Sequence, residues 1–578
     1  MKRNYLSILT LAIALMVIAS GTAFAASSSY SGTITIDEGE ALYPEAYVTY
    51  NADDYDFGTT YTYNVSTMAW EGTAPASSVI SVESESSTVT MTNKSGNLIS
   101  ITLTGTNKDL NVVINGKGSP VKLTLSDLTL NSSIRALQVK KSDCYLFLEG
   151  TNSLSADAGS SENNVLKVAG NLIINGTGNL SVTANTKNGI VSDAVICIQS
   201  GDIIVTVTNK TTDKGTAIKP MLGFVMLDGS LTIYGNNSTR GLESKGIKVD
   251  GYEADSDLEG LSGGMGYVVI DGGTINIQTQ GKAISAGWDS DDDDIPASKS
   301  DYPSPDVYIN GGDISITTYA TPRDDTSTVD GVSPEGIEAK NNMYITGGNF
   351  TLKTTDDCLN AGNSMSISGG LIYAWSTNND AIDAGGEENE GYFHISGGAL
   401  IAMGSSMPET GLDCNSNARF IYTGGIVIAM GGAQNNSPSG TGTSAYTVTT
   451  SGASAGKSYA LVQNGEVVLA FKVPSGYRYG NSVLLGTEDL ELGDATLVSG
   501  ATVTASESYN DAIHYGTVKV SGGTESSVTV SQSSSNGMGG MGGFGGPSGQ
   551  QGGFGGGQPS GGPSGAPSGG GRGGWGWF

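Results

Sequence analysis

Carboxyl and amide side chains recur at matching positions of four short phrases in the second half of the chain. The phrases are EGIEAK (335–340), DDCLNAG (356–362), NDAIDAG (379–385) and TGLDCN (410–415). In each phrase one polar residue stands between two apolar or small residues, and in an extended strand it faces away from the buried side. These outward residues are Glu338, Asn360, Asp383 and Asp413. A stack of such strands therefore predicts a ladder of oxygen-bearing side chains.

A second set of acids precedes the strand of each phrase. Like charges on neighbouring strands destabilise a sheet by up to about 1 kcal/mol per pair, so we expect a cation between the rungs. Carboxylate and amide oxygens without a His or Cys cluster favour Ca²⁺ over Zn²⁺. The predicted calcium ligands are Glu335, Glu338, Asp356, Asp357, Asn360, Asn379, Asp380, Asp383 and Asp413. A hydrated acidic face with shifted pKa values, or an ion that only braces the strands, would produce the same pattern.

A repeat positions these acids. Gly347, Gly369, Gly397 and Gly424 each begin a Gly pair, and they follow one another at intervals of 22 to 28 residues. Such a period is typical of one supersecondary unit per repeat. The strands between the Gly pairs are short and carry apolar residues at alternate positions. Hairpins of a β-sandwich would share this pattern, but the near-identical polarity of the units favours an all-β fold, a parallel β-helix solenoid of about ten coils.

The composition changes along the chain and predicts five segments. Residues 1–25 carry Lys2 and Arg3, an apolar run and a small-x-small site at Ala23 and Ala25, as in a secretory signal peptide. Residues 26–110 are expected to form an N-terminal β region or cap, 111–440 the parallel β-helix and 441–530 a C-terminal β region. Residues 531–578, rich in Gly, Ser and Pro, are expected to be a disordered tail with possible cell-wall contact.

The signal predicts a secreted, extracellular or cell-surface protein without a transmembrane anchor after cleavage; a retained anchor is the alternative. The charge balance excludes one class of partner, because 28 Lys and Arg against 57 Asp and Glu give a net charge of −29. That charge opposes binding to nucleic acid and attracts metal cations. Cys358 and Cys414 are expected to be free thiols, with Cys358 facing outward and Cys414 inward.

The acid-bearing phrases, interleaved with Gly-Gly strands over about residues 100–530, resemble the secreted carbohydrate-binding domain-containing family of right-handed parallel β-helices. The resemblance implies binding of cellulose or of acidic pectic sugars such as polygalacturonic acid. That family is itself similar to polysaccharide lyases of family nine, in which a DDGxD-type turn holds a catalytic calcium. Asp356, Asp357 and Asn360 match that turn, and Asn379, Asp380 and Asp383 match a second copy. Cys358 stands where the motif has Gly, and Asn360 stands where it has Asp.

Three functions are compatible with these residues. The favoured one is a calcium-dependent polysaccharide-binding protein for acidic or cellulosic glycans, with Tyr373 and Trp375 as candidate sugar platforms that could equally be packing residues. The second is a pectate-type lyase, whose base would be Lys340, Lys353 or Arg419, because the similar lyases use a lysine near the calcium. The third is a non-enzymatic surface adhesin or scaffold.

Overall fold

The computed structural model describes residues 28–44, 47, 49–157, 164–185, 187–208, 214–249, 266–287, 305–385 and 391–532. The predicted signal peptide and nearly all of the predicted tail lie outside these residues. Within them the regular structure is β-strand apart from two single-turn 3₁₀ helices, η1 (Ala52–Asp54) and η3 (Asn417–Arg419). The prediction of an all-β fold is confirmed for these residues. None of the helices in this part of the chain is long and apolar enough to span a membrane.

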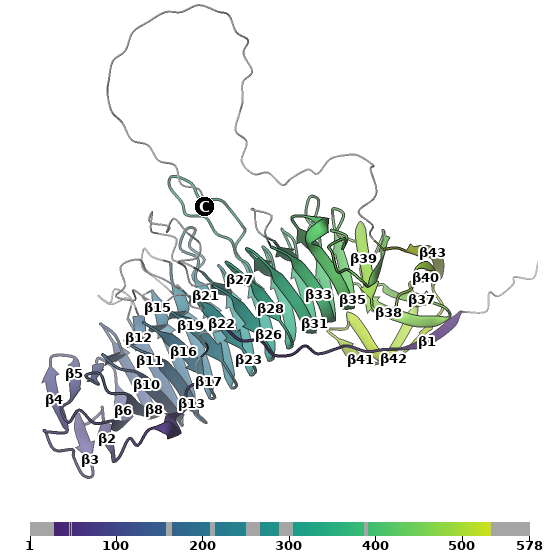
Figure 1. The fold of residues 1–578 in the computed structure, drawn as a ribbon. Coiled ribbons are helices and arrows are strands. Elements are labelled where there is room, and N and C mark those ends of the chain that lie inside the picture. The colour runs from purple at the N-terminus through teal and green to yellow at the C-terminus, as the bar shows by residue number, and fades with distance from the viewer. Residues whose placement is uncertain are drawn as a thin grey trace, which may run out of the picture.

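Most strands stack in parallel along one axis, three strands to each repeat (Figure 1). One repeat is formed by β12 (Asn164–Val168), β13 (Leu172–Gly176) and β14 (Asn179–Ala184). They pair in parallel with β15 (Asn188–Ser192), β16 (Val195–Ile198) and β17 (Asp202–Val207), respectively. The chain thus returns to the same place after every repeat, and equivalent residues meet on neighbouring strands.

The first column of strands is a thirteen-stranded sheet that carries the acid-bearing phrases. Besides β12 and β15 it contains β4 (Ile80–Glu85), β5 (Thr88–Asn93), β7 (Asn111–Asn115), β9 (Leu137–Lys140), β18 (Thr216–Pro220), β21 (Lys245–Val249), β24 (Ile284–Ala286), β27 (Ile337–Ala339), β30 (Leu359–Ala361), β32 (Ile382–Ala384) and β34 (Leu412–Cys414). Only β4 and β5 pair in an antiparallel manner among the described strands of this sheet.

The second and third columns belong to one continuous sheet. The second contains, with β13 and β16, β10 (Cys144–Glu149), β19 (Gly223–Met226), β22 (Tyr267–Ile270), β25 (Val307–Ile309) and β28 (Met343–Ile345). The third contains, with β14 and β17, β11 (Thr151–Ala156), β20 (Ser230–Gly235), β23 (Thr274–Thr279), β26 (Asp313–Thr318) and β29 (Asn349–Thr354). Long strands run through both columns near the ends of the stack: β6 (Ile99–Asn107), β8 (Val121–Ser132), β31 (Met365–Ser376), β33 (Phe393–Met403) and β35 (Phe420–Gly431). At the edges lie β2 (Thr60–Asn64), β3 (Ala69–Glu71), β36 (Tyr446–Thr450) and β39 (Ser482–Thr487).

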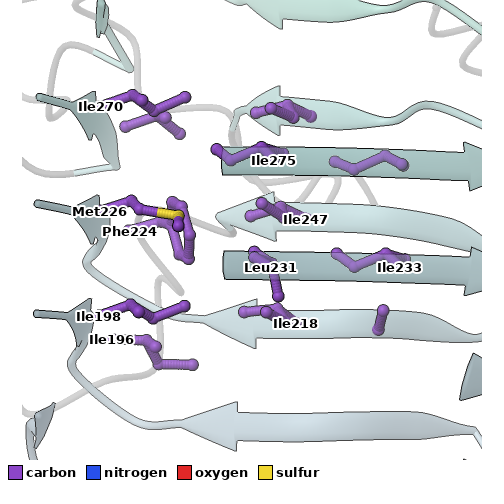
Figure 2. Packing of buried hydrophobic residues seen from close by; sticks show 14 of the residues in the cluster. Ile196, Ile198, Ile218, Phe224, Met226, Leu231, Ile233, Ile247, Ile270 and Ile275 are labelled. Atoms are coloured by element: carbon purple, nitrogen blue, oxygen red, sulfur yellow. The ribbon is translucent and has the colours of Figure 1, made fainter. Parts of the chain in front are cut away.

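The core lies between these columns, because alternate residues of every strand point inward. Ile218, Ile247 and Ile284 are in register on successive strands of the first sheet, and all three are fully buried. Figure 2 shows Ile218 and Ile247 facing Phe224 and Leu231 of the other columns. Burying each such side chain contributes about 1.5–3 kcal/mol, so the repeated apolar position fixes the register of the polar residues between them.

The Gly pairs stand where the second column turns into the third. Gly348 has φ of +93°, which costs little only for glycine. A Cβ on Gly347 would lie 2.4 Å from the carbonyl oxygen of Asn310 on the repeat below. The glycines therefore form the corner between the second and third columns, whereas the candidate functional residues lie in the first column.

A second, seven-stranded sheet packs at the C-terminal end of the stack. Its strands are β1 (Ser29–Ile34), β37 (Ser458–Gln463), β38 (Glu466–Lys472), β40 (Gly493–Ser499), β41 (Thr502–Tyr509), β42 (Ile513–Ser521) and β43 (Thr524–Val530). The N-terminal strand β1 pairs with β42 in this sheet. The following segment runs along the stack toward β2 (Figure 1), where Gly39 N donates to Thr346 O and Leu42 N to Asn310 Oδ1.

Candidate functional site

The outward residues of the first sheet form one continuous column. Glu338 of β27 is in register with Asn360 of β30, which is followed by Asp383 of β32 and Asp413 of β34. One rung below Glu338 stands Ser285 of β24. The spacing of rungs in a parallel sheet, about 4.8 Å, therefore separates neighbouring members of the ladder.

The lower end of the ladder is neutralised by lysine. Lys282 Nζ lies 2.8 Å from Glu335 Oε2 and 2.5 Å from Glu338 Oε1. Lys340 Nζ lies 2.6 Å from the same oxygen of Glu338, and Ser285 Oγ donates to Glu338 Oε2 at 2.7 Å. Both glutamates are buried. These two predicted calcium ligands are therefore already engaged by side chains of the protein.

The pKa values of Glu335, Glu338 and Lys282 depend on one another. Burial alone would raise the pKa of Glu338, but Lys282 and Lys340 together hold it well below its usual range. Burial and the Glu338 carboxylate raise the pKa of Glu335, since Lys282 is shared between the two acids. Burial would lower the pKa of Lys282, but Glu338 and Glu335 raise it instead. Glu338 is therefore an ionised, fully paired carboxylate.

Asp356 is held by neutral partners. Asn379 Nδ2 donates to its Oδ1 at 2.7 Å, and Ser333 Oγ donates to its Oδ2 at 3.0 Å. Ser333 Oγ also lies 2.9 Å from Glu335 Oε1. Asp356 and Asn379, predicted from two different phrases, are thus brought into direct contact. Their contact joins the two copies of the acidic turn.

Asp357, Asp380 and Asp383 have no cation in contact within the described residues. Asp357 is 4% exposed; its Oδ2 accepts from Asn360 Nδ2 at 3.3 Å, but its Oδ1 has no hydrogen-bond partner there. Asp380 Oδ1 accepts hydrogen bonds from the backbone amide and the hydroxyl of Thr410. Asp357 and Asp380 are buried and Asp383 is partly buried. This upper end of the ladder therefore holds carboxyl groups that have no compensating cation in the described part of the chain.

The same three acids have strongly raised pKa values. Burial raises the pKa of Asp357 well above its usual range, and the carboxylate of Asp383 adds to it. Burial, with Asp413 and Asp383, raises the pKa of Asp380 to about 8. Burial, with Asp413 and Glu335, raises the pKa of Asp383 to about 7. Without a cation, part of this group is therefore protonated at neutral pH.

The residues fit a hard cation in their chemistry. The orphaned Asp357 Oδ1, the carboxyl groups of Asp383 and Asp380 and the Asn360 amide oxygen are the ligand types that Ca²⁺ takes. In the described part of the chain no group of three or more His, Cys, Asp or Glu side chains already stands at ligand spacing. Holding an ion here therefore requires side-chain adjustment, and the deprotonation of acids with raised pKa values.

A cleft of about 600 Å³ opens beside the lower end of the ladder. Its floor includes Glu335, Glu338 and Asn360, and its wall is the segment that follows β26. Arg323 of that segment forms a two-point ion pair with Glu243, 2.7 and 2.8 Å long. The segment between β26 and β27 is thus tied by Arg323 to Glu243, which precedes β21, two rungs from β27 in the first sheet.

Five cations line this cleft, namely Lys214, Lys245, Lys282, Lys340 and Arg323. Four of them have a carboxylate partner, with Lys214 Nζ lying 3.2 Å from Asp330. Lys245 has none among the described residues. Burial and the neighbouring Lys248, Lys282 and Lys214 lower the pKa of Lys245 to about 7. At one repeated position of the sequence the earlier repeats carry lysine and the later ones carry an acid. This change indicates which part of the cleft contains the lysines.

A model of the carbohydrate-binding domain-containing protein family matches residues 85–381, about half of the 578-residue chain. The chain belongs to this family. The predicted resemblance to the carbohydrate-binding domain-containing family is confirmed over these residues, and the family supports carbohydrate binding in general. The matched part of this carbohydrate-binding domain-containing protein includes the cleft and Asp357, whereas Asp383 and Asp413 follow it.

Comparisons with individual proteins give a distant structural similarity. No curated protein matches this family member. Among solved structures it is similar to the polysaccharide lyase-like protein from C. thermocellum, in a gadolinium derivative, at 16% sequence identity and a TM-score of 0.33. That match covers 54% of this chain and 96% of the other. The similarity to family-nine lyases remains a prediction.

The three cations predicted as possible bases lie in different places. Lys340 is paired with Glu338 beside the cleft. Lys353 lies on β29 in the other sheet, with its Nζ 4.7 Å from the ring centre of Trp375. Arg419 Nη1 donates to the carbonyl of Gly391 at 3.1 Å. The structure does not bring them together.

The candidate sugar platforms Tyr373 and Trp375 lie on β31, away from the ladder. Both are partly buried against the C-terminal β region, where Trp375 packs edge to face on Tyr477 with ring centres 6.0 Å apart. This is the packing role that the sequence left open. All four cysteines are free, but Cys358 is buried, and its Sγ lies 3.0 Å from Thr354 Oγ1. The expectation that Cys358 faces outward is wrong, because β30 begins only at Leu359 and the alternation does not reach back to residue 358.

Proposed function

We propose that this carbohydrate-binding domain-containing protein is an exported, calcium-dependent binder of acidic polysaccharides such as polygalacturonate. The observation that carries the proposal is the buried Asp357 carboxyl group, which has an unpartnered oxygen and lies near Asp383 and Asp380. Ionisation of Asp357, Asp380 and Asp383 in one place is unfavourable without a compensating cation. We further infer that the stacked columns are the coils of a right-handed β-helix.

In this proposal the residues that would bind calcium differ from those that are paired with lysine. Asp357, Asp380 and Asp383, with Asn360, would hold the ion, whereas Lys282 and Lys340 keep Glu335 and Glu338 out of that role. Bound calcium would bridge sugar carboxylates to the aspartates and so reverse the local repulsion between two anions. Asp356, fixed by Asn379 and Ser333, holds the two acidic turns at a constant distance.

Acidic sugars are favoured over cellulose for a specific reason. Neutral glucans stack on exposed aromatic rings, and the two predicted rings are partly covered by the C-terminal β region. The cleft instead presents cations and carboxylates, which suit a charged ligand. A lyase is less supported, since Lys340, Lys353 and Arg419 all have contacts that occupy them.

Retention on immobilised polymers tests the proposal. The purified protein is passed over polygalacturonate and over cellulose, first in calcium and then in a chelator. We expect retention on polygalacturonate in calcium that falls sharply on chelation, and little retention on cellulose. Equal retention in both solutions would refute the calcium requirement. No retention on either polymer would favour an adhesin or scaffold.

A further inference from the structure

The cleft holds one lysine that the rest of the site does not use. Lys245 begins β21, and its backbone amide donates to the carbonyl of Gly215 at 2.8 Å, so its position is fixed by the sheet. Its side chain is only partly exposed. Every other cation of the cleft contacts a carboxylate, but Lys245 contacts none in the described residues. A partly buried ammonium group without a counter-ion is unfavourable, and an incoming anion would relieve it.

The surroundings of Lys245 are basic. Lys214 and Lys282 also line the cleft, and both, with Lys248, act electrostatically on Lys245. Glu338 is the acid that acts on it from the ladder, and Glu338 is already neutralised by two lysines. The cleft lining also contains six acids, of which Glu243, Glu335 and Glu338 are paired with Arg323 or with lysine. Because the charges that act most strongly on Lys245 are those of three lysines, a ligand of negative charge is attracted to its side chain.

We propose that Lys245 is a metal-independent subsite for the carboxylate of an acidic sugar, in line with the calcium-dependent subsite at Asp357 and Asp383. The proposal rests on the proposed function and adds a second anchor to it. β21 and β30 are three rungs apart in the same sheet, so the two subsites are separated by about 14 Å along the stack. An acidic glycan that reaches both would lie parallel to the axis of the stack, across the floor of the cleft.

The two proposed subsites should make different contributions to the affinity for polygalacturonate. The lysine subsite needs the sugar carboxylate but no metal, whereas the aspartate subsite needs both. The full-length protein should therefore retain weak affinity for polygalacturonate in a chelator, and none for the same polymer after its carboxyl groups have been reduced to alcohols. Adding calcium should then increase the affinity for the carboxylated polymer alone.

Three variants separate Lys245 from a general charge effect. Lys245→Met removes the charge and keeps the length, Lys245→Arg keeps the charge, and Lys167→Met is the matched control. Lys167 is an outward lysine of the same sheet, paired with Asp193 at 3.1 Å and remote from the cleft lining. In chelator, Lys245→Met should weaken polygalacturonate binding about tenfold to a hundredfold, the effect of losing one charged hydrogen bond. Lys245→Arg and Lys167→Met should bind within about threefold of the wild type, inside the usual scatter of surface substitutions.

A measurement on the wild-type protein does not depend on the folding of a variant. Acetylation of Lys245 is followed by mass spectrometry in chelator, with and without polygalacturonate. We expect the polymer to protect Lys245, and the carboxyl-reduced polymer to leave it reactive. Unchanged acetylation in the presence of polygalacturonate would overturn the proposal.

The two proposals fail in different ways. If the wild type binds only when calcium is present, or if Lys245→Met binds as well as the wild type in chelator, the lysine subsite is wrong and the calcium-dependent function stands. If binding in chelator depends on Lys245 but calcium adds nothing, the lysine subsite stands and the calcium-dependent function is wrong.

Discussion

Glu338 and Asp383 stand in the same outward column of one sheet, two rungs apart, but their carboxyl groups have opposite electrostatic surroundings. Two lysines hold the pKa of Glu338 well below its usual range. Burial and neighbouring acids raise the pKa of Asp383 to about 7. The ladder is therefore two sites, a lysine-paired lower end and an uncompensated upper end.

The lower end should be important for stability. Replacing Glu338 with Gln leaves the partly buried Lys282 with one of its two carboxylate partners, and breaking an ion pair whose acid is buried costs about 3–5 kcal/mol. Lys340→Met is the matched variant, because the Lys340 side chain is 46% exposed and an exposed pair contributes about 1 kcal/mol or less. Denaturant unfolding measures both. Equal losses for the two variants would contradict the assignment of Glu338 as the buried centre of the network.

The upper end should make the calcium-free protein less stable as pH rises. Asp380 and Asp383 have pKa values of about 8 and about 7, above their ordinary value, so the folded state binds more protons than the unfolded state between about pH 4 and 8. Their stabilising contribution is complete below about pH 4 and is lost as pH rises through the folded values. Thermal unfolding in chelator should show this decline. A melting temperature that increases from pH 5 to 8 would be inconsistent with it.

Removing one of these carboxyl groups should raise the stability of the calcium-free protein and lower its affinity for calcium. Asp383→Asn should raise the melting temperature of the calcium-free protein at pH 8, because it removes a charge from an uncompensated group. Calorimetric titration of the same variant should give a calcium affinity lower by about tenfold to a hundredfold, the usual cost of disturbing a metal site. Asp202→Asn, at an exposed acid of β17, is the control and should change neither quantity. A variant Asp383→Asn with wild-type calcium affinity would remove Asp383 from the site.

The protein should not cleave polygalacturonate at a rate typical of a lyase. The predicted bases are occupied by Glu338, by the Trp375 ring and by the Gly391 carbonyl, respectively. Incubation with polygalacturonate and calcium should therefore release no unsaturated, ultraviolet-absorbing products above a protein-free control. Sustained release that Asp383→Asn abolishes would show that the bound polymer is a substrate.

The sequence predicted the ladder because a strand has a period of two and the apolar residues mark the buried face. Ile337, Leu359, Ile382 and Leu412 fix the phase, so the residue after each one had to face outward. Lys282 and Glu335 stand two residues before their strands, in the second set of polar residues, where the lysine lies one rung below the acid. Rung spacing alone does not say which of two acids a lysine neutralises.

Other features depend on contacts that have no local sequence pattern. Arg323 reaches Glu243 across 80 residues of sequence, and this ion pair forms the wall of the cleft. The cover over Trp375 comes from Tyr477 of the C-terminal β region. Alternation could put Tyr373 and Trp375 on one face, but it could not say whether that face was open. The burial of Cys358 similarly depends on where the chain turns before β30.

Calcium-dependent binding can be measured as the affinity for polygalacturonate in calcium and in chelator, for the wild type and for Asp383→Asn. The wild type should bind at least about tenfold more tightly in calcium than in chelator, with weak residual binding in chelator, and Asp383→Asn should lose most of that difference. Equal affinity of the wild type in the two solutions, or a calcium effect that survives unchanged in Asp383→Asn, would contradict this expectation.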